Sequence, residues 1–260
     1  MNILMIGDVC GQPGRRILEA ELSQLRKTYS PLLTIVNGEN AAGGRGINKK
    51  IAQQMMEWGT QVITLGNHAF DNRELFDFID ESKTIVRPLN YPPDTPGHGY
   101  TIVNMNGTHI AVVNLLGRSF MQPMDDPFRA MDHLLEEIKG KADYIIVDFH
   151  AETTSEKEAM GWYLDGRVHM VIGTHTHVQT ADERILPKGT AYLTDVGMTG
   201  PRDSVLGMET EQVLKRFITQ LPIRFEVASG PAQLNAVSVT FDPKTKRALR
   251  MERIQVIEEI

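Results

Sequence analysis

Two short histidine-containing motifs have the residue types of a hydrolytic metal centre. Gly66-Asn67-His68 follows one apolar run, and Gly173-Thr174-His175-Thr176-His177 follows another. A side-chain amide, a free imidazole and two imidazoles one residue apart are suited to hold divalent ions against a phosphate and to protonate its leaving group. Because His175 and His177 alternate along the chain, they would share one face of a strand, as metal binding requires. These motifs predict half of a two-metal hydrolase.

The other half is expected upstream, where four more polar side chains follow strand-like apolar runs. They are Asp8, the neighbouring pair Glu39 and Asn40, and His150. In an open α/β sheet, side chains just beyond the carboxyl ends of neighbouring strands converge on one crevice. Taken alone, Asp8 is as easily a turn former and His150 as easily a hydrogen-bonded core histidine. Their common position at strand ends favours a metal site.

Two further features near these residues have competing interpretations. Glycine in Gly43-Gly44-Arg45-Gly46 permits close backbone approach, so Arg45 is a candidate to pair with a substrate phosphate. The run lacks the Lys and Ser/Thr of a P-loop, and a flexible surface loop is the alternative. Cys10 lies two residues after Asp8, but a lone free cysteine is more often a small buried hydrophobe than a ligand.

Composition limits the class of protein. At 260 residues, with 41% hydrophobic and 23% charged residues, the chain can bury one sizeable core, so we expect a single domain over residues 1–260. A net charge of −6 argues against sequence-independent binding to duplex DNA. The single cysteine excludes an internal disulfide, and the N-terminus does not resemble a secretory leader, so a cytoplasmic location is expected. No apolar run approaches the roughly 18 residues of a membrane span, so no membrane partner is expected.

Strand and helix patterns alternate in the first half of the chain. Strands are predicted at 2–7, 32–36 and 61–65, and helices are predicted after Pro13, at 51–58 and at 71–80. The first helix carries apolar residues at positions 18, 22 and 25, which form one stripe. Such alternation favours a parallel sheet covered by helices.

The second half is richer in β-structure. Segment 91–99 is a Pro- and Gly-rich loop, and Asn106-Gly107 predicts a hairpin turn between strands 100–105 and 108–115. A helical stripe at 128–138 leads to a strand at 144–148, and further strands are predicted at 223–227, 236–241 and 248–257. The expected fold is therefore an α/β sandwich in which two mixed β-sheets pack between α-helices, with all ligand loops at one end.

The motifs, taken in order, resemble those of the calcineurin-like metallophosphoesterase superfamily. The matching residues are Asp8, Gly38-Glu39-Asn40, Gly66-Asn67-His68, His150 and the 173–177 motif. Over nearly the whole length, including 148–157 and 194–200, the chain looks like the YmdB branch of bacterial 2′,3′-cyclic-nucleotide phosphodiesterases. Three departures stand out: Cys10 replaces the histidine of the usual Asp-x-His, Glu39 replaces a bridging Asp, and Ala69 replaces an acidic residue that often orients the histidine. The partner of His68 is therefore left open.

The resemblance implies a binuclear centre with Glu39 as the bridging ligand. The implied ligands are Asp8, Glu39, Asn40 and His177 for one metal, and Glu39, Asn67, His150 and His175 for the other. Two ions roughly 3.5–4 Å apart can clamp a phosphate and supply a metal-bound hydroxide as nucleophile. His68 would protonate the leaving alkoxide as general acid. Mixed nitrogen and carboxylate ligation suits Fe, Mn or Zn better than Mg or Ca, and the resemblance implies Fe or Mn, with Zn as an alternative.

The expected activity is phosphodiester hydrolysis, with 2′,3′-cyclic nucleotides or RNA-derived phosphodiesters as the substrate class implied by the resemblance. A phosphomonoesterase of the nucleotidase or phosphatase kind would use the same metals. An amidohydrolase fits less well, because its His-x-His usually follows the first strand. From a different class, a regulatory protein of RNA metabolism with low turnover would act through a partner, and the resemblance also implies an RNA-processing partner and a homo-oligomer.

Overall fold

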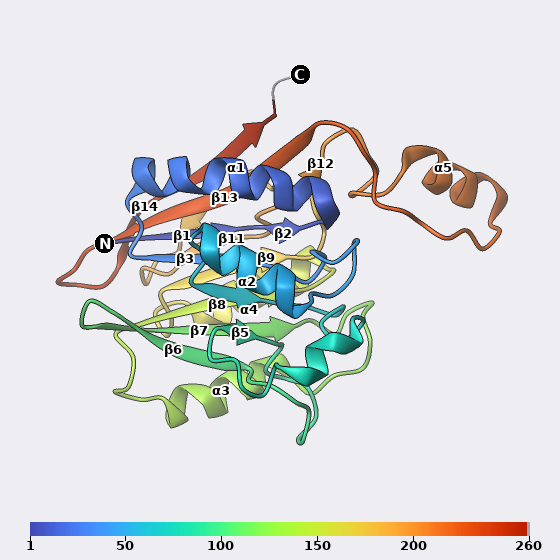
Figure 1. Cartoon of the computed structure of the whole chain (residues 1–260). Helices are drawn as coiled ribbons and strands as arrows, with labels where there is room; N and C mark the ends of the chain where they lie inside the picture. The colour runs from blue at the N-terminus through green and yellow to red at the C-terminus, as the bar shows by residue number, and fades with distance from the viewer. Residues whose placement is uncertain (259–260) are drawn as a thin grey trace.

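Two β-sheets stack face to face in the computed structural model, which describes residues 1–258, and most helices cover their outer faces (Figure 1). The first sheet has the strand order β2-β12-β13-β1-β3-β4-β5, with β14 paired to β13. Its strands are β1 (Asn2–Ile6), β2 (Asp8–Val9), β3 (Leu33–Asn37), β4 (Val62–Thr64), β5 (Ile85–Val86), β12 (Met198–Pro201), β13 (Ala232–Phe241) and β14 (Ala248–Ile257). Strands β1, β3, β4 and β5 run parallel, whereas β13 is antiparallel to both β1 and β14.

The second sheet has the order β10-β11-β9-β8-β7-β6. Its strands are β6 (Tyr100–Met105), β7 (Thr108–Leu116), β8 (Tyr144–His150), β9 (Met170–Thr174), β10 (Arg184–Ile185) and β11 (Ala191–Leu193). Strands β7, β8, β9 and β11 are parallel, and β6 joins β7 through the Asn106-Gly107 turn, where both residues have positive φ. The predicted hairpin and the predicted pair of mixed sheets are both confirmed.

Three cores follow from the alternation of side chains along the strands. In β1, Ile3 and Met5 point into the core between the two sheets, whereas Leu4 and Ile6 belong to the core beneath the first helices. A third core lies beneath the helices of the second sheet. The helices are α1 (Gly11–Tyr29), α2 (Lys49–Trp58), η1 (Arg73–Asp77), α3 (Pro127–Glu137), α4 (Thr154–Leu164) and α5 (Thr210–Thr219). None of these helices is both long and apolar enough to span a membrane.

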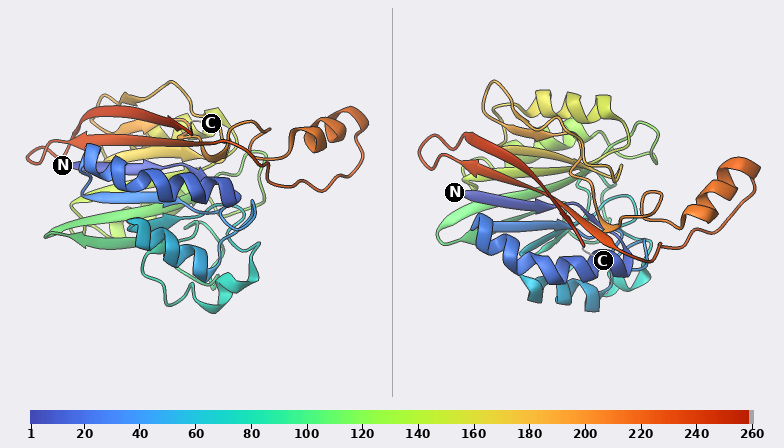
Figure 2. Two further views of the ribbon diagram at one scale, coloured as in Figure 1. Left: turned by 45° about the horizontal axis from the view of Figure 1, so that its top comes forward. Right: turned by 90° about the horizontal axis from the view of Figure 1, so that it is seen from above.

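Several predicted elements need correction. The helix predicted at 71–80 is only the short 3₁₀ helix η1, because turns on both sides interrupt it. The strand predicted at 223–227 is wrong: this segment has no regular secondary structure apart from an isolated bridge between Met208 and Val227. Helices α4 and α5 were not expected from the sequence, and α5 projects away from the sheets (Figures 1 and 2).

Candidate metal centre

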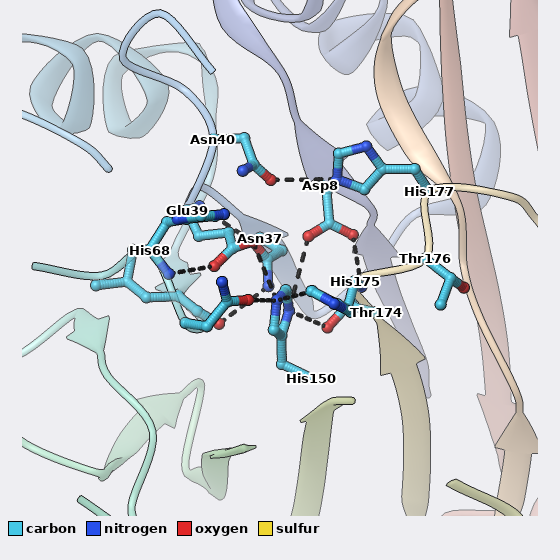
Figure 3. A network of polar contacts seen from close by, with 12 residues as sticks. Asp8, Asn37, Glu39, Asn40, His68, His150, Thr174, His175, Thr176 and His177 are labelled. Carbon is cyan, nitrogen blue, oxygen red and sulfur yellow. Dashed lines mark hydrogen bonds and ion pairs between the residues drawn. The ribbon is translucent and has the colours of Figure 1, made fainter. Parts of the chain in front are cut away.

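The candidate ligands lie together where strands of both sheets end at the same edge (Figure 3). The first sheet contributes Asp8 in β2 and the residues that follow β3 and β4. The second sheet contributes His150, the last residue of β8, and the loop after β9. Residues far apart in the chain therefore face one site, as the strand-end positions predict.

The candidate ligand atoms lie closest together around His150. Its Nε2 atom lies 3.0 Å from Glu39 Oε1, from Asn67 Oδ1 and from His175 Nδ1. Ligand atoms of Glu39, His150 and His175 all lie within 4.8 Å of one another. One ring nitrogen cannot make good hydrogen bonds to three such partners at once, whereas a cation held between them satisfies all of them. The donor set therefore fits a metal ion.

Gly66 makes this approach sterically possible. A Cβ atom at this position would lie 2.3 Å from Glu39 Oε2 and 2.5 Å from His150 Nε2. Any side chain would displace both donor atoms, so glycine is required by the space that they occupy.

A second group of donors surrounds Asp8. His177 Nε2 lies 3.3 Å from Asn40 Oδ1, and Asp8 Oδ2 accepts a hydrogen bond of 3.3 Å from the backbone N–H of His175. Asp8 is fully buried, and its Oδ1 atom lies 3.7 Å from His150 Nδ1 but has no hydrogen-bond partner among residues 1–258. A buried polar atom without a hydrogen bond costs about 1–3 kcal/mol, which a bound cation would offset. These residues therefore fit a second metal ion beside the first.

Each of the three imidazoles is anchored through one nitrogen and presents the other to the site. Thr174 Oγ1 donates to Asp148 Oδ1 (2.7 Å), so this hydroxyl must accept from His150 Nδ1 (2.8 Å). In the neutral imidazole, that bond leaves the Nε2 atom of His150 free of hydrogen and able to bind a metal. Hydrogen bonds of this kind orient histidines that bind metals.

The other two imidazoles show the same arrangement with different anchors. His177 Nδ1 donates to the backbone carbonyl of Leu206 (3.0 Å), which leaves its Nε2 facing Asn40. His175 Nε2 lies 3.0 Å from Glu152 Oε2, which leaves its Nδ1 facing His150. A hydroxyl, a carbonyl and a carboxylate thus each hold one nitrogen of a histidine ring. The other nitrogen of each ring then faces the candidate metal centre.

The loop from His175 to His177 departs from the strand-face reasoning. Both histidines have positive φ, 97° and 64°, and they lie beyond the end of β9, so their alternation on a strand is not what brings them together. Instead, Thr176 donates its N–H and its hydroxyl to Asp195 Oδ2, at 3.0 and 2.7 Å. Lys157 Nζ donates to the same oxygen at 2.7 Å, and this ion pair is buried. The buried Lys157–Asp195 pair therefore holds the loop from His175 to His177 in place through the hydrogen bonds from Thr176.

His68 lies beside the donors in a different role. Its backbone N–H donates to Glu39 Oε2 (3.0 Å), and its Nδ1 lies 2.9 Å from Asp71 Oδ2. Asp71 therefore supplies the partner that the sequence left open, three residues after His68 rather than one. Arg45 Nη1 is 3.9 Å from the same carboxylate and its side chain is 69% exposed. The wall of the adjoining cavity, of about 250 Å³, includes Arg45, His68 and Glu152.

Burial and mutual attraction shift the titration of these groups. Burial raises the pKa of Asp8 to about 6. Burial alone would raise the pKa of Glu39, but the charge and hydrogen bond of His150 lower it to about 2, and despite burial the pKa of His150 rises to about 9. Without a cation, His150 is thus the counter-ion of Glu39, and metal binding would replace its proton. Burial also raises the pKa of Cys10 to about 12, so this residue is a buried thiol and not a thiolate ligand.

Comparisons with known proteins agree over the full length of the chain. A model of the family described as YmdB-like protein matches residues 4–254. The chain is 53% identical over 259 residues to a Bacillus subtilis protein named 2′,3′-cyclic-nucleotide 2′-phosphodiesterase, covering 100% of this chain and 98% of the relative. A Thermus thermophilus crystal structure superposes with a TM-score of 0.94 at 46% identity, covering 100% of both chains. A Mycoplasma pneumoniae structure described as a novel phosphatase has the same TM-score at 40% identity and covers 100% of this chain and 94% of that chain.

Proposed function

This chain belongs to the YmdB-like family, and from that premise we propose that it is a metal-dependent phosphodiesterase that acts on 2′,3′-cyclic nucleotides or related RNA-derived diesters. The observation that supports the proposal most directly is the convergence of Glu39, His150 and His175 beside a cavity that His68 lines. The substrate class rests on the name of the Bacillus subtilis relative, which is 53% identical over 259 residues.

We assign the metal ligands to two overlapping sets that share Glu39. Asp8, Asn40 and His177 would complete one set, and Asn67, His150 and His175 the other. Bound cations would polarise the phosphate and lower the pKa of an attacking water. The donors are imidazole, amide and carboxylate, with no thiolate, so we propose iron or manganese, with zinc as the alternative.

We assign His68 as the general acid. Its Nδ1 is held by Asp71, so Nε2 is the atom left to deliver a proton to the leaving oxygen. Arg45 lines the same cavity, and its exposed guanidinium is placed to contact the non-bridging oxygens of a phosphate. Because the ligands come from both sheets, we propose that residues 1–260 act as one domain; residues 259 and 260 lie outside the described part.

The Mycoplasma pneumoniae structure, described as a phosphatase, favours phosphomonoester hydrolysis as the second candidate. The metals and ligands would be the same, and the cavity would differ only in accepting a terminal phosphate. A regulatory protein with low turnover would show the same metal content without rapid hydrolysis of any diester.

The test combines metal analysis with three substrates. The protein is purified without added metal, its bound metals are measured by elemental analysis, and 2′,3′-cyclic AMP, 3′,5′-cyclic AMP and AMP are assayed side by side. We expect near two metals per chain and preferential hydrolysis of the 2′,3′-cyclic diester, both lost in Glu39→Gln. Glu136→Gln is the matched control, because Glu136 is exposed on α3 and belongs neither to the proposed ligands nor to the cavity wall. A metal-replete protein that hydrolyses only AMP would favour the monoesterase, and one inactive on all three would overturn the enzymatic proposal.

A further inference from the structure

A tight turn at residues 205–208 supplies the apolar part of the cavity wall beside the candidate metal centre. Of the wall residues within 1–258, only Leu206 and Met208 carry apolar side chains, and Leu206 is 50% exposed. The rest of the wall is glycine or polar, as at Arg45, His68 and Glu152. Neither the metals nor the general acid requires an apolar neighbour here, so the two apolar side chains need a different explanation.

Leu206 has a backbone conformation that glycine adopts more easily. The backbone N–H and carbonyl groups of Val205 and Met208 bond to each other at 3.0 Å, and the two residues between them, Leu206 and Gly207, have φ of 53° and 93°. Positive φ at both central positions is the mark of a type I′ turn, in which Asn and Gly are preferred. A bulky residue with this conformation is an outlier, and such outliers cluster at functional sites. Glycine would suit the turn at least as well, so we expect the Leu206 side chain to act outside the turn.

Contacts with two neighbouring segments hold the turn in place. The Gly207 carbonyl accepts from the Ala228 N–H at 2.9 Å. Met208 packs against the loop of Gly43-Gly44-Arg45-Gly46, because a Cβ atom at Gly44 would lie 3.3 Å from Met208 Cε. The turn is therefore a fixed part of the wall, beside the loop that carries the proposed phosphate contact, Arg45.

The turn lies one imidazole ring away from the candidate metal ligands. The Leu206 carbonyl accepts from His177 Nδ1 at 3.0 Å, whereas Nε2 of the same ring faces Asn40. The ring of His177 therefore stands between the turn and the ligand atoms. A phosphate at the metals would lie on the Nε2 side, so the group that reaches Leu206 must extend beyond the phosphate. On a nucleotide that group is the base, because the ribose lies directly next to the phosphate.

We propose that the base of the substrate packs its flat face against Leu206 and Met208 while its phosphate lies at the metal centre. This inference rests on the proposed function, because it takes a nucleotide as the substrate. Apolar side chains contact the face of a base and do not read its hydrogen-bonding edge, so the turn accepts any base. A larger base covers more apolar surface, so the turn favours purines.

Leu206→Gly removes the side chain and keeps a backbone that glycine adopts readily. Steady-state kinetics compare 2′,3′-cyclic AMP with methyl ribofuranoside 2′,3′-cyclic phosphate, which carries the same diester and no base. For the cyclic nucleotide we expect KM to rise about five- to tenfold with kcat unchanged, because a half-exposed leucine side chain no longer covers the base. KM for the baseless diester, the metal content and the unfolding temperature should stay close to their wild-type values.

Two further variants separate the role of the side chain from that of the turn. Asn106→Gly is the matched control, because Asn106 also has positive φ, 54°, in the turn between β6 and β7, at the end of β7 away from His150. This variant should behave as wild type on both diesters. Leu206→Met keeps an apolar side chain at the wall and should keep KM for 2′,3′-cyclic AMP near the wild-type value.

The size of the base provides a second readout. In the wild type, KM for 2′,3′-cyclic AMP should be lower than KM for 2′,3′-cyclic CMP, and the two values should approach each other in Leu206→Gly. A purine preference of the same size in both proteins would place the base elsewhere and overturn the inference.

The remaining outcomes distinguish this inference from the proposed function. If Leu206→Gly raises KM equally for the nucleotide and the baseless diester, Leu206 contacts the ribose or the phosphate, and the inference is wrong. It is also wrong if neither KM changes. A wild-type protein that hydrolyses neither diester would overturn the proposed function, and the inference with it.

Discussion

Asp71 should control how well His68 protonates the leaving group. The Asp71 carboxylate lies 2.9 Å from His68 Nδ1, and its side chain is 39% exposed, so solvent screens the contact. A charge-assisted hydrogen bond is worth about 1.5–3 kcal/mol, and partial exposure favours the lower end. Since about 1.4 kcal/mol of barrier corresponds to tenfold in rate, Asp71→Asn should lower kcat on 2′,3′-cyclic AMP about tenfold. His68→Ala removes the acid altogether and should lower it by about 10² to 10⁴.

The decisive measurement compares leaving groups. A nitrophenyl diester expels a stable anion that needs no proton, so both variants should hydrolyse it at close to the wild-type rate. Metal content should be unchanged, because Asp71 touches none of the assigned ligands. Asp77→Asn, an exposed aspartate of η1, is the matched control and should behave as wild type. An equal loss of activity on both substrates would refute the proton-delivery role and leave Asp71 as a structural residue of the loop.

Three more predictions concern the metal centre and stability. Gly66→Ala should fold yet retain little metal in elemental analysis, because its Cβ occupies the space of two donor atoms; full metal content would show that the loop can move aside. Lys157→Met should destabilise the protein by about 3–5 kcal/mol in urea unfolding, because Asp195 stays buried without its counter-charge, and a change below about 1 kcal/mol would contradict this. Burial lowers the pKa of His169 to about 4, and its Nδ1 accepts from the Ile145 N–H, so the folded state resists its protonation. Because the unfolded state binds this proton near pH 6.5, stability should fall by roughly 3 kcal/mol between pH 6.5 and 4; the same slope in His169→Gln would refute the assignment.

The positions of the candidate ligands at one sheet edge could be predicted, because each depends only on a short sequence pattern. A polar residue directly after an apolar strand lies at the carboxyl edge whatever the rest of the fold does, and parallel strands bring such edges together. That reasoning placed Asp8, Glu39 and His150 at one edge without knowledge of strand order. The structure shows that they lie close together and come from two different sheets.

Other features depend on contacts that no local pattern records. The bond from Thr176 to Asp195 joins residues 19 apart, and Lys157 reaches the same carboxylate from a helix whose apolar residues form no single stripe. The left-handed backbone of His175 and His177 is imposed by this network, so spacing alone suggested a strand face instead. Helix α5 is a different case. The spacing of its apolar residues can be seen in the sequence, but such a stripe normally indicates packing against the same chain. The exposed apolar side chains of α5 have no such packing within residues 1–258.

The anchors of the three imidazoles explain why folding and metal binding should be coupled. His150 is oriented by Thr174 at the end of β9, His175 by Glu152 ahead of α4, and His177 by the carbonyl of Leu206, between β12 and α5. None of these anchors is adjacent in sequence to the histidine that it orients, so each donor nitrogen is correctly aimed only when distant segments are in place. The unfolded chain therefore has no preformed site, and cations that bind the folded state add their binding free energy to its stability. Removing metal with a chelator should accordingly lower the unfolding temperature of the wild type, and it should lower it far less in Glu39→Gln, in which the shared ligand is already lost.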